Sequence, residues 1–280
     1  MTTTSPSWFD VPRPIHNLFK LFPLQVYAAE PLPARAPGRN RRRAQLYVFA
    51  SEEGAVQGLP SYNPTCLKWQ TYLRIAGLDI DIIPSTNHAS PSGSLPYLLP
   101  ESSDSRSSIP LTGEKISQYA QKYTSIRDRT SPRVDVYLSL LAQSVRPAWL
   151  HTLYINPSHT TLLSNLYLPS SPLLRTSLLH TLRSAATSEI LKTTRRPLLQ
   201  PAQLYRDAKT AFATLSTLLG ANEWFFGAEE PGLFDAEVFA YTYLILDDSL
   251  GWKDDTLARC VANRENLVEH RKRLYERCWG

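Results

Sequence analysis

The sequence is poor in the residues and segments that would mark a secreted, membrane-spanning or thiol-rich protein. Three Cys among 280 residues exclude a scaffold built on disulfides and suit a reducing compartment or a cytosol-facing surface. No apolar run reaches the roughly 18–20 residues that cross a bilayer. The first ten residues, MTTTSPSWFD, contain neither the cations nor the apolar stretch of a signal peptide. We therefore expect a soluble or peripherally bound protein.

Motifs for metal, nucleotide or hydrolase chemistry are also missing. The 6 His residues do not pair with Cys or carboxylates at metal-binding spacing. The chain has no His-Glu-x-x-His, no Gly-x-Ser-x-Gly and no phosphate-binding glycine loop. We expect no metal site and no cofactor.

The positive charge of the chain comes from one short tract. The formal net charge is +5. The tract has no acidic residue and consists of Arg35, Arg39, Arg41, Arg42 and Arg43. Nucleic-acid-binding proteins usually spread cations over a folded face together with stacking aromatic rings, so we expect no nucleic-acid partner. The tract is either a solvated loop or a contact with an anionic surface.

Composition divides the chain into three zones. Residues 1–44 are rich in Pro and Arg and contain a short amphipathic segment with Ile15, Leu18, Phe19 and Phe22 on one face. It could dock on the rest of the protein or lie on a membrane, and docking is favoured because the segment has few cations for lipid head groups. Residues 45–123 alternate strand and helix patterns. Residues 132–280 have helical patterns throughout, which predicts α/β followed by all-α structure.

The second zone predicts a small mixed sheet. Residues 46–49 and 78–83 have strand patterns, and a helix from Asn63 to Gly77 lies between them, which makes a βαβ unit with parallel strands. Strands at 95–99 and 109–111 and a helix over 113–123 follow. The third zone predicts a helix through Val134 and Trp149, kinked at Pro147. Further helices are predicted at 173–195, 202–219, 233–247, 256–261 and 266–278.

Two positions in the sequence correspond to those that hold the ligand-binding and reactive groups of thioredoxin-like proteins. Leu95-Pro96 opens a strand, where a cis proline presents the preceding backbone to a thiol or extended peptide. The first helix begins with Asn63-Pro64-Thr65-Cys66, where the helix N-terminus would lower the pKa of a thiol. Asn63 takes the exposed place, and Cys66 is predicted to point inward as a structural residue. Asp235, in the first turn of a later helix, is predicted to support folding rather than form a site.

Three stretches resemble the metaxin family, whose members have a glutathione-transferase-like fold: NPTCLKWQTYLRIAG at 63–77, NHASPSGSLP at 87–96, and FFG at 225–227 with LFDA at 233–236. The segment VPRPIHNLFKLFPL at 11–24 is similar to fungal metaxin-like subunits. The resemblance implies a thioredoxin-like domain at 45–123 and an all-helical domain at 132–280.

The resemblance also implies a role. Such subunits lie peripherally on the cytosolic face of the mitochondrial outer membrane, in the sorting and assembly machinery. Their partners are its barrel-forming core subunit, a second metaxin-like subunit and β-barrel precursors, whose sorting signal they help to recognise and insert. The residues predicted to contact a partner or peptide are Asn87, His88, Ser94, Leu95 and Pro96. A sheet edge or a groove beside Pro96 can take an extended segment.

The alternative is an active glutathione transferase. That enzyme pattern has a catalytic Tyr, Ser or Cys just after the first strand or at the helix start, and here a long loop with Ser51 intervenes. Thr112-Gly113-Glu114-Lys115 replaces the Glu-Ser pair that grips glutathione, and Gly232 replaces the Ser or Thr that usually precedes the Asp235 cap. We therefore predict a binding and assembly subunit without catalysis.

Overall fold

The computed structural model describes residues 42–101, 109–124, 132–169 and 171–280, without the side chains of 172 and 173. Residues Asn40–Gly280 form one compact unit. The amphipathic segment predicted around Ile15 lies outside the described residues. The predicted boundaries at 44 and between 123 and 132 remain predictions.

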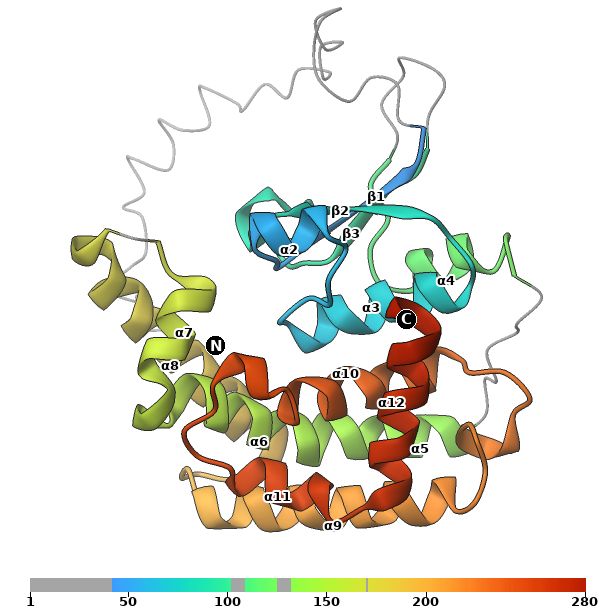
Figure 1. Cartoon of the computed structure of the whole chain (residues 1–280). Helices are drawn as coiled ribbons and strands as arrows, with labels where there is room; N and C mark the ends of the chain where they lie inside the picture. Colours follow the sequence, from blue (N-terminus) through green and yellow to red (C-terminus); the bar gives the residue numbers. More distant parts are fainter. Residues whose placement is uncertain (1–41, 102–108, 125–131, 170) are drawn as a thin grey trace, which may run out of the picture. The chain divides into compact units, whose positions relative to one another are not determined.

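A three-stranded sheet forms the first half of this unit (Figure 1). β1 (Ala44–Val48) lies between β2 (Ile80–Pro84) and β3 (Tyr97–Leu99). β1 pairs in parallel with β2 and antiparallel with β3, with Leu46 opposite Ile82 and Leu98. The parallel pair joined through a helix confirms the predicted βαβ unit.

The predicted strand at 109–111 is wrong. The structure has a single bridge there, in which Leu98 and Leu111 exchange backbone hydrogen bonds of 2.8 Å. The next hydrogen-bonded pair of this antiparallel ladder would join Ile109 to Pro100, and Pro100 has no N–H to donate, so the ladder does not extend beyond the bridge in that direction. The helix predicted over 113–123 is present as α4 (Glu114–Ala120).

α3 (Pro64–Ile75) is the central helix. Pro64 occupies its first turn, and Asn63 is its N-cap, as the sequence predicts. Residues on all sides of α3 are buried, among them Leu67, Tyr72 and Leu73, which is typical of a helix enclosed by other elements. The sheet lies on one side of α3 and α10 (Leu233–Ile245) on the other (Figure 1).

Helices make up the second half. The predicted helix through Val134 and Trp149 is a continuous run of four pieces, in which α-helical and wider π-helical segments alternate. Pro147 lies just inside α6, directly after the π segment η2. A proline removes one backbone donor, and a π-bulge is one way for a helix to absorb such a change. The pieces are α5 (Pro132–Leu140), η2 (Leu141–Val145), α6 (Arg146–Leu150) and η3 (His151–Ile155).

The later helices agree with the sequence prediction to within one or two residues at most ends. They are α8 (Pro172–Thr194), α9 (Pro201–Leu219), α10, α11 (Thr256–Ala262) and α12 (Glu265–Trp279). Two helices were not predicted from the sequence, α2 (Glu52–Val56) and α7 (Thr160–Tyr167). α2 has only five residues, so it is too short to show a helical period.

Candidate functional site

The first turn of α3 holds the position where a thioredoxin-like enzyme carries its reactive group. Asn63 occupies it, and both ends of its side-chain amide are engaged. The Oδ1 atom accepts a hydrogen bond from the Cys66 N–H at 3.2 Å, and Nδ2 donates to the Tyr167 hydroxyl at 3.1 Å. Because the amide is neutral and held from two sides, this position offers neither a nucleophile nor a base.

Cys66 lies on the inward side of α3, as predicted. Its exposed fraction is 0%, and burial raises the pKa of its thiol to about 12. The thiolate, which is the nucleophile in thiol chemistry, is therefore almost absent at neutral pH. The helix N-terminus, which would lower this pKa at an exposed position, does not overcome the desolvation.

Aromatic rings pack around the start of α3. The Tyr167 ring lies 5.0 Å from that of Phe49, 5.3 Å from that of Tyr62 and 5.6 Å from that of Tyr154. Burial raises the pKa of the Tyr62 hydroxyl to about 12. Tyr167 comes from α7, which the sequence analysis missed, so this contact between the two halves was not predictable from the motifs.

Ser51 is a helix cap in this structure. Its Oγ accepts a hydrogen bond from the Gly54 N–H at 3.0 Å and so begins α2. A Ser followed by the two acidic residues Glu52 and Glu53 is a common start of a helix. That pattern was available in the sequence and explains Ser51 without a catalytic role.

Hydrogen bonds fix the long loop before α3 against the end of β1 and against α3 itself. The Gln70 Oε1 atom accepts from the Ser61 N–H at 2.8 Å, and its Nε2 atom donates to the Leu59 carbonyl at 2.8 Å. The Ser61 hydroxyl donates to the Phe49 carbonyl at 2.6 Å. These buried bonds hold the loop in one position beside the helix start.

The segment 87–96 divides into an exposed and a buried part. Asn87, His88 and Ser94 are exposed, whereas Leu95 and Pro96 are buried. The Leu95-Pro96 peptide bond is cis, as the sequence predicts. The Asn87 Oδ1 atom accepts the Leu95 N–H at 3.0 Å. A side chain of this protein therefore occupies the donor that precedes the proline.

The outer edge of β3 offers little to an added strand. In an antiparallel strand, alternate residues direct their backbone groups to the same side. Leu98 faces outward and is bonded to Leu111. The positions two residues before and after it are Pro96 and Pro100, which have no N–H.

The edge at β2 is protected by charge and by Pro84. Arg43 lies 3.0 Å from the Asp79 carboxylate and 3.9 Å from that of Asp81. Charged residues and proline on an edge strand disfavour pairing with another chain. Arg43 is thus already paired, Arg42 is exposed, and Arg35, Arg39 and Arg41 lie outside the described residues.

Polar contacts join α3 to the helical half along its length. Besides the Asn63–Tyr167 bond at its start, Lys68 forms an ion pair with Glu237 of α10 near its middle. At its end, Arg74 donates to the Gly58 carbonyl at 2.8 Å and to the Cys278 carbonyl of α12. These contacts hold the two halves together as one body.

Asp235 is the centre of a buried cluster in the helical half. Its carboxylate accepts hydrogen bonds of 3.0 Å from the N–H groups of Phe225 and Gly232, and its Oδ1 atom lies 3.0 Å from the His270 Nε2 atom. Asp235 and His270 are 3% and 0% exposed. Asp235 therefore supports folding, as predicted, because it bonds the N-cap residue Gly232 of α10 and ties the start of that helix to Phe225 and to His270 of α12.

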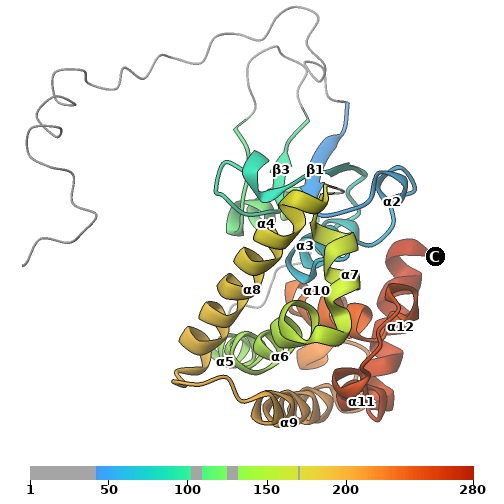
Figure 2. The ribbon, with the colours of Figure 1, turned by 90° about the vertical axis from the view of Figure 1, so that its left-hand side faces the viewer.

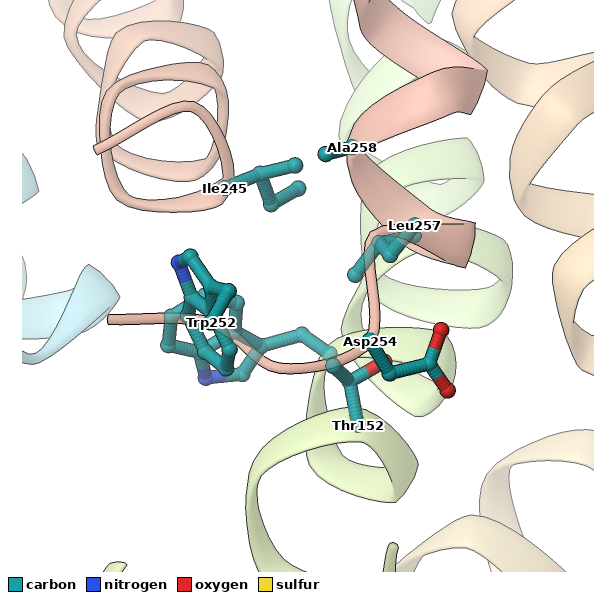
Figure 3. Close-up of a pocket in the computed structure, with 7 residues that line it drawn as sticks. Thr152, Ile245, Trp252, Asp254, Leu257 and Ala258 are labelled. Atoms are coloured by element: carbon teal, nitrogen blue, oxygen red, sulfur yellow. The ribbon is translucent and has the colours of Figure 1, made fainter. Parts of the chain in front are cut away.

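A small pocket lies elsewhere in the helical half, between Trp149, Thr152, Ile245, Trp252 and Leu257 (Figure 3). Its space is about the size of one water molecule. Its one charged residue, Asp254, accepts hydrogen bonds from Asn156 and Thr256 and points away from Trp252 (Figure 3). The pocket cannot hold glutathione or a comparable ligand.

His151, close to this pocket, makes stability depend on pH. Burial lowers the pKa of His151, so the unfolded chain binds a proton more readily than the folded protein. Stability should therefore fall as the pH drops below about 6.5, by up to about 1.4 kcal/mol per pH unit from this residue. Urea unfolding between pH 7 and 5 should show a shallower decline for His151→Gln.

The matched control for this test is His180→Gln, because His180 is exposed. It should leave the pH dependence unchanged. An equal slope in wild type and His151→Gln would contradict the assignment.

Within the residues that the structure describes, no group of His, Cys, Asp and Glu could hold a metal ion. In the same residues, no helix is both long and apolar enough to cross a membrane.

Two related family models match parts of the chain. The family model "Glutathione S-transferase N-terminal domain" matches residues 64–159, and "Glutathione S-transferase, C-terminal domain" matches residues 208–274. Among solved structures, glutathione S-transferase III in apo form has a TM-score of 0.46 at 16% identity, covering 83% of this chain and 91% of that one. FzlA from C. crescentus has a TM-score of 0.46 at 14% identity, covering 85% and 90%. The fold assignment rests on the family models.

Curated relatives of the chain are metaxins. Metaxin-3 of Xenopus laevis is 28% identical over 244 residues, which cover 80% of this chain and 71% of the relative. Metaxin-1 of Homo sapiens is 28% identical over 232 residues, which cover 79% of this chain and 48% of the relative. The chain thus spans about half the length of human Metaxin-1.

Proposed function

Because this chain belongs to the metaxin family and has a glutathione-transferase-like fold, we propose that it is a non-catalytic subunit of mitochondrial protein import. More specifically, we propose a peripheral subunit on the cytosolic face of the mitochondrial outer membrane, within the sorting and assembly machinery. There it would bind the barrel-forming core subunit and a second metaxin-like subunit, and help to recognise and insert β-barrel precursors.

The proposal that the protein is not a catalyst depends on the residues at the start of α3. A transferase of this fold activates a thiol beside this helix end. Here that position is the half-buried amide of Asn63, bonded to the Cys66 N–H and the Tyr167 hydroxyl, and the nearby thiol has a pKa of about 12. Binding of other polypeptides needs no such group, so the fold can serve as a rigid body for assembly.

The two outer strands of the sheet disfavour binding of a precursor by strand addition. β3 has proline on both sides of its one outward N–H, and β2 carries charge and proline. We therefore propose that the protein recognises a precursor through side chains. The exposed side chains of Asn87, His88 and Ser94 would make the contact, and the buried residues Leu95 and Pro96 would hold this segment in place. The tract from Arg35 to Arg43 would add attraction to anionic lipid, worth about 1 kcal/mol per free cation at such a surface.

Two measurements test the proposal. Full-length tagged chain, isolated from mitochondria in mild detergent, should co-purify with the barrel-forming core subunit and the second metaxin-like subunit. Failure to recover either would contradict the role in assembly. The purified chain should also show no conjugation of glutathione to a generic electrophile above the uncatalysed rate. Turnover that disappears in Ser51→Ala would establish the alternative, an active transferase.

A further inference from the structure

The connection between α8 and α9 carries an exposed leucine among basic residues. Leu198 is 70% exposed, whereas its neighbour Leu199 packs against the core. Within eight positions on either side of Leu198 the sequence has four basic residues and no acidic one. The basic residues are Lys192, Arg195, Arg196 and Arg206. Figure 2 shows this connection at the outer edge of the helical half, where α8 ends and α9 begins.

An ion pair holds this connection against α9. The Arg196 guanidinium lies 2.9 Å from the Asp207 carboxylate, which also accepts a hydrogen bond of 2.7 Å from Gln203. The connection is thereby tied to the second turn of α9. Arg195 and Arg206 each follow or precede one member of this ion pair in the sequence, and both are exposed. The fold therefore brings basic residues from the end of α8 and the start of α9 to one region of the surface.

The acidic residues nearest to Leu198 in the sequence do not neutralise these charges. Asp207 is paired with Arg196, and Glu189 of α8 is paired with Arg146 of α6. Four cations of this region are exposed and belong to neither pair. They are Lys192, Arg195, Arg206 and Lys209. We call Leu198 and these four cations the basic corner.

Stabilisation of the helix ends does not account for the basic corner. Cations near the end of a helix complement its dipole, which is a sufficient reason for Lys192 and Arg195. The dipole gives no such reason for Arg206 and Lys209, because they lie in the first half of α9. It also gives no reason for an exposed leucine, whose apolar surface is disfavoured in water. The basic corner therefore has the composition of a contact site.

An anionic lipid surface fits the charge and the leucine together. Segments that bind such surfaces combine Lys and Arg, which are attracted to anionic head groups, with apolar side chains that enter the layer below. Val56 of the same protein has the opposite surroundings. It is 90% exposed, but the charged residues within eight positions of it are Glu52 and Glu53, which anionic lipid repels. Exposed apolar surface by itself is thus not the signal, which requires the basic surroundings of Leu198.

We propose that the basic corner binds anionic phospholipid, with Leu198 inserted into the head-group layer and the four cations against the head groups. The contact holds the end of α8 and the start of α9 at the membrane, in addition to any attraction of the tract from Arg35 to Arg43. It goes beyond the proposed role in assembly, because it concerns the purified chain and lipid alone. Its failure would therefore leave co-purification with the assembly partners untouched.

Flotation of the full-length chain with vesicles tests the charges. The vesicles contain phosphatidylcholine with about 30% phosphatidylserine, which gives them a negative surface potential. Lys192→Glu combined with Arg206→Glu should weaken binding at least about tenfold, because two attractive charges become repulsive. The matched control combines Lys115→Glu with Lys122→Glu, two exposed residues in and just after α4 of the sheet half. It makes the same change in net charge and should bind like the wild type, because about 0.1 M salt screens charges outside the contact.

Three results of this test would overturn the proposal. In the first, both double variants lose binding to the same extent, which would reduce the effect to net charge. In the second, Lys192→Glu combined with Arg206→Glu binds as well as the wild type. In the third, the wild type does not bind the vesicles, which would leave an acidic protein surface as the occupant of the basic corner. Circular dichroism should show that the variants are folded.

A fluorescent probe on a new thiol tests the insertion of Leu198. The three native cysteines are buried, so the full-length Leu198→Cys variant can be labelled selectively with an NBD group, which emits more strongly in apolar surroundings. Its emission should rise and shift to shorter wavelength when the anionic vesicles are added, because the side chain at this position leaves water. Val56→Cys is the matched control and should show no change. Equal changes at both positions, or none at Leu198→Cys, would overturn the proposal.

Discussion

Replacing Asp235 by Ala should lower the free energy of unfolding by about 3 kcal/mol or more. The carboxylate is 3% exposed and accepts from two backbone N–H groups while it contacts His270. Its removal leaves these groups buried without an acceptor and leaves a space that water fills poorly. The loss should appear in urea unfolding as a lower midpoint with little change in slope.

The controls separate the buried cluster from a general effect of losing an acidic residue. Asp255 also lies at a helix start, but it is exposed and forms a surface pair with Arg259. Asp255→Ala should cost less than about 0.5 kcal/mol. Asp235→Asn keeps the shape but offers one acceptor atom, so its effect should lie between the two. A loss below about 1 kcal/mol in Asp235→Ala would show that the cluster contributes little.

The native thiols should react with the disulfide reagent DTNB at pH 8 on the order of 10³-fold more slowly than the same thiols in unfolded protein. Burial raises the pKa of Cys66 to about 12 and that of Cys278 to about 11, and it also raises the pKa of Cys260. Each unit of pKa increase lowers the thiolate fraction about tenfold when the pH is below the pKa. Burial also blocks the reagent, so reaction requires local or global unfolding.

Asn63→Cys is the informative comparison for thiol reactivity. It puts a thiol at the N-cap of α3, where the helix dipole lowers the pKa. This variant should gain one thiol that reacts at a rate near that of a free cysteine. If a thiol of the wild type reacts as quickly as that new thiol, and this reaction is lost in Cys66→Ser, the thiol of α3 is accessible and the proposal of a non-catalytic subunit fails.

Local pattern predicted most of the fold. The β-α-β order, the start of α3 at Asn63-Pro64 and the helices of the second half follow from periodicity and from capping residues, which act over a few neighbouring positions. The inward orientation of Cys66 follows from its place in the first turn of that helix. The failures are α7 and two shorter elements, α2 and the single bridge at Leu111, which contain too few residues to show a period.

Contacts between distant residues were out of reach of the sequence. The amide of Asn63 meets Tyr167, more than one hundred positions later, and the Cys278 carbonyl meets Arg74. Such pairs depend on how α3 is laid against α7, α10 and α12, which no local spacing encodes. The same is true of the sheet edges, because only the pairing of Leu98 with Leu111 places Pro96 and Pro100 on the outer side of β3.

Residue types and their spacing were thus enough to predict a half with a β-sheet, an all-helical half and a resemblance to the metaxin family. They also predicted that the start of α3 has no exposed nucleophile. The packing of these parts settled the rest: the amide of Asn63 at the reactive position is bonded to a tyrosine of the other half, and Arg43 is paired with Asp79. The physical reason is that spacing along the chain determines local backbone structure, whereas burial and partners arise from side chains that meet only in the folded body.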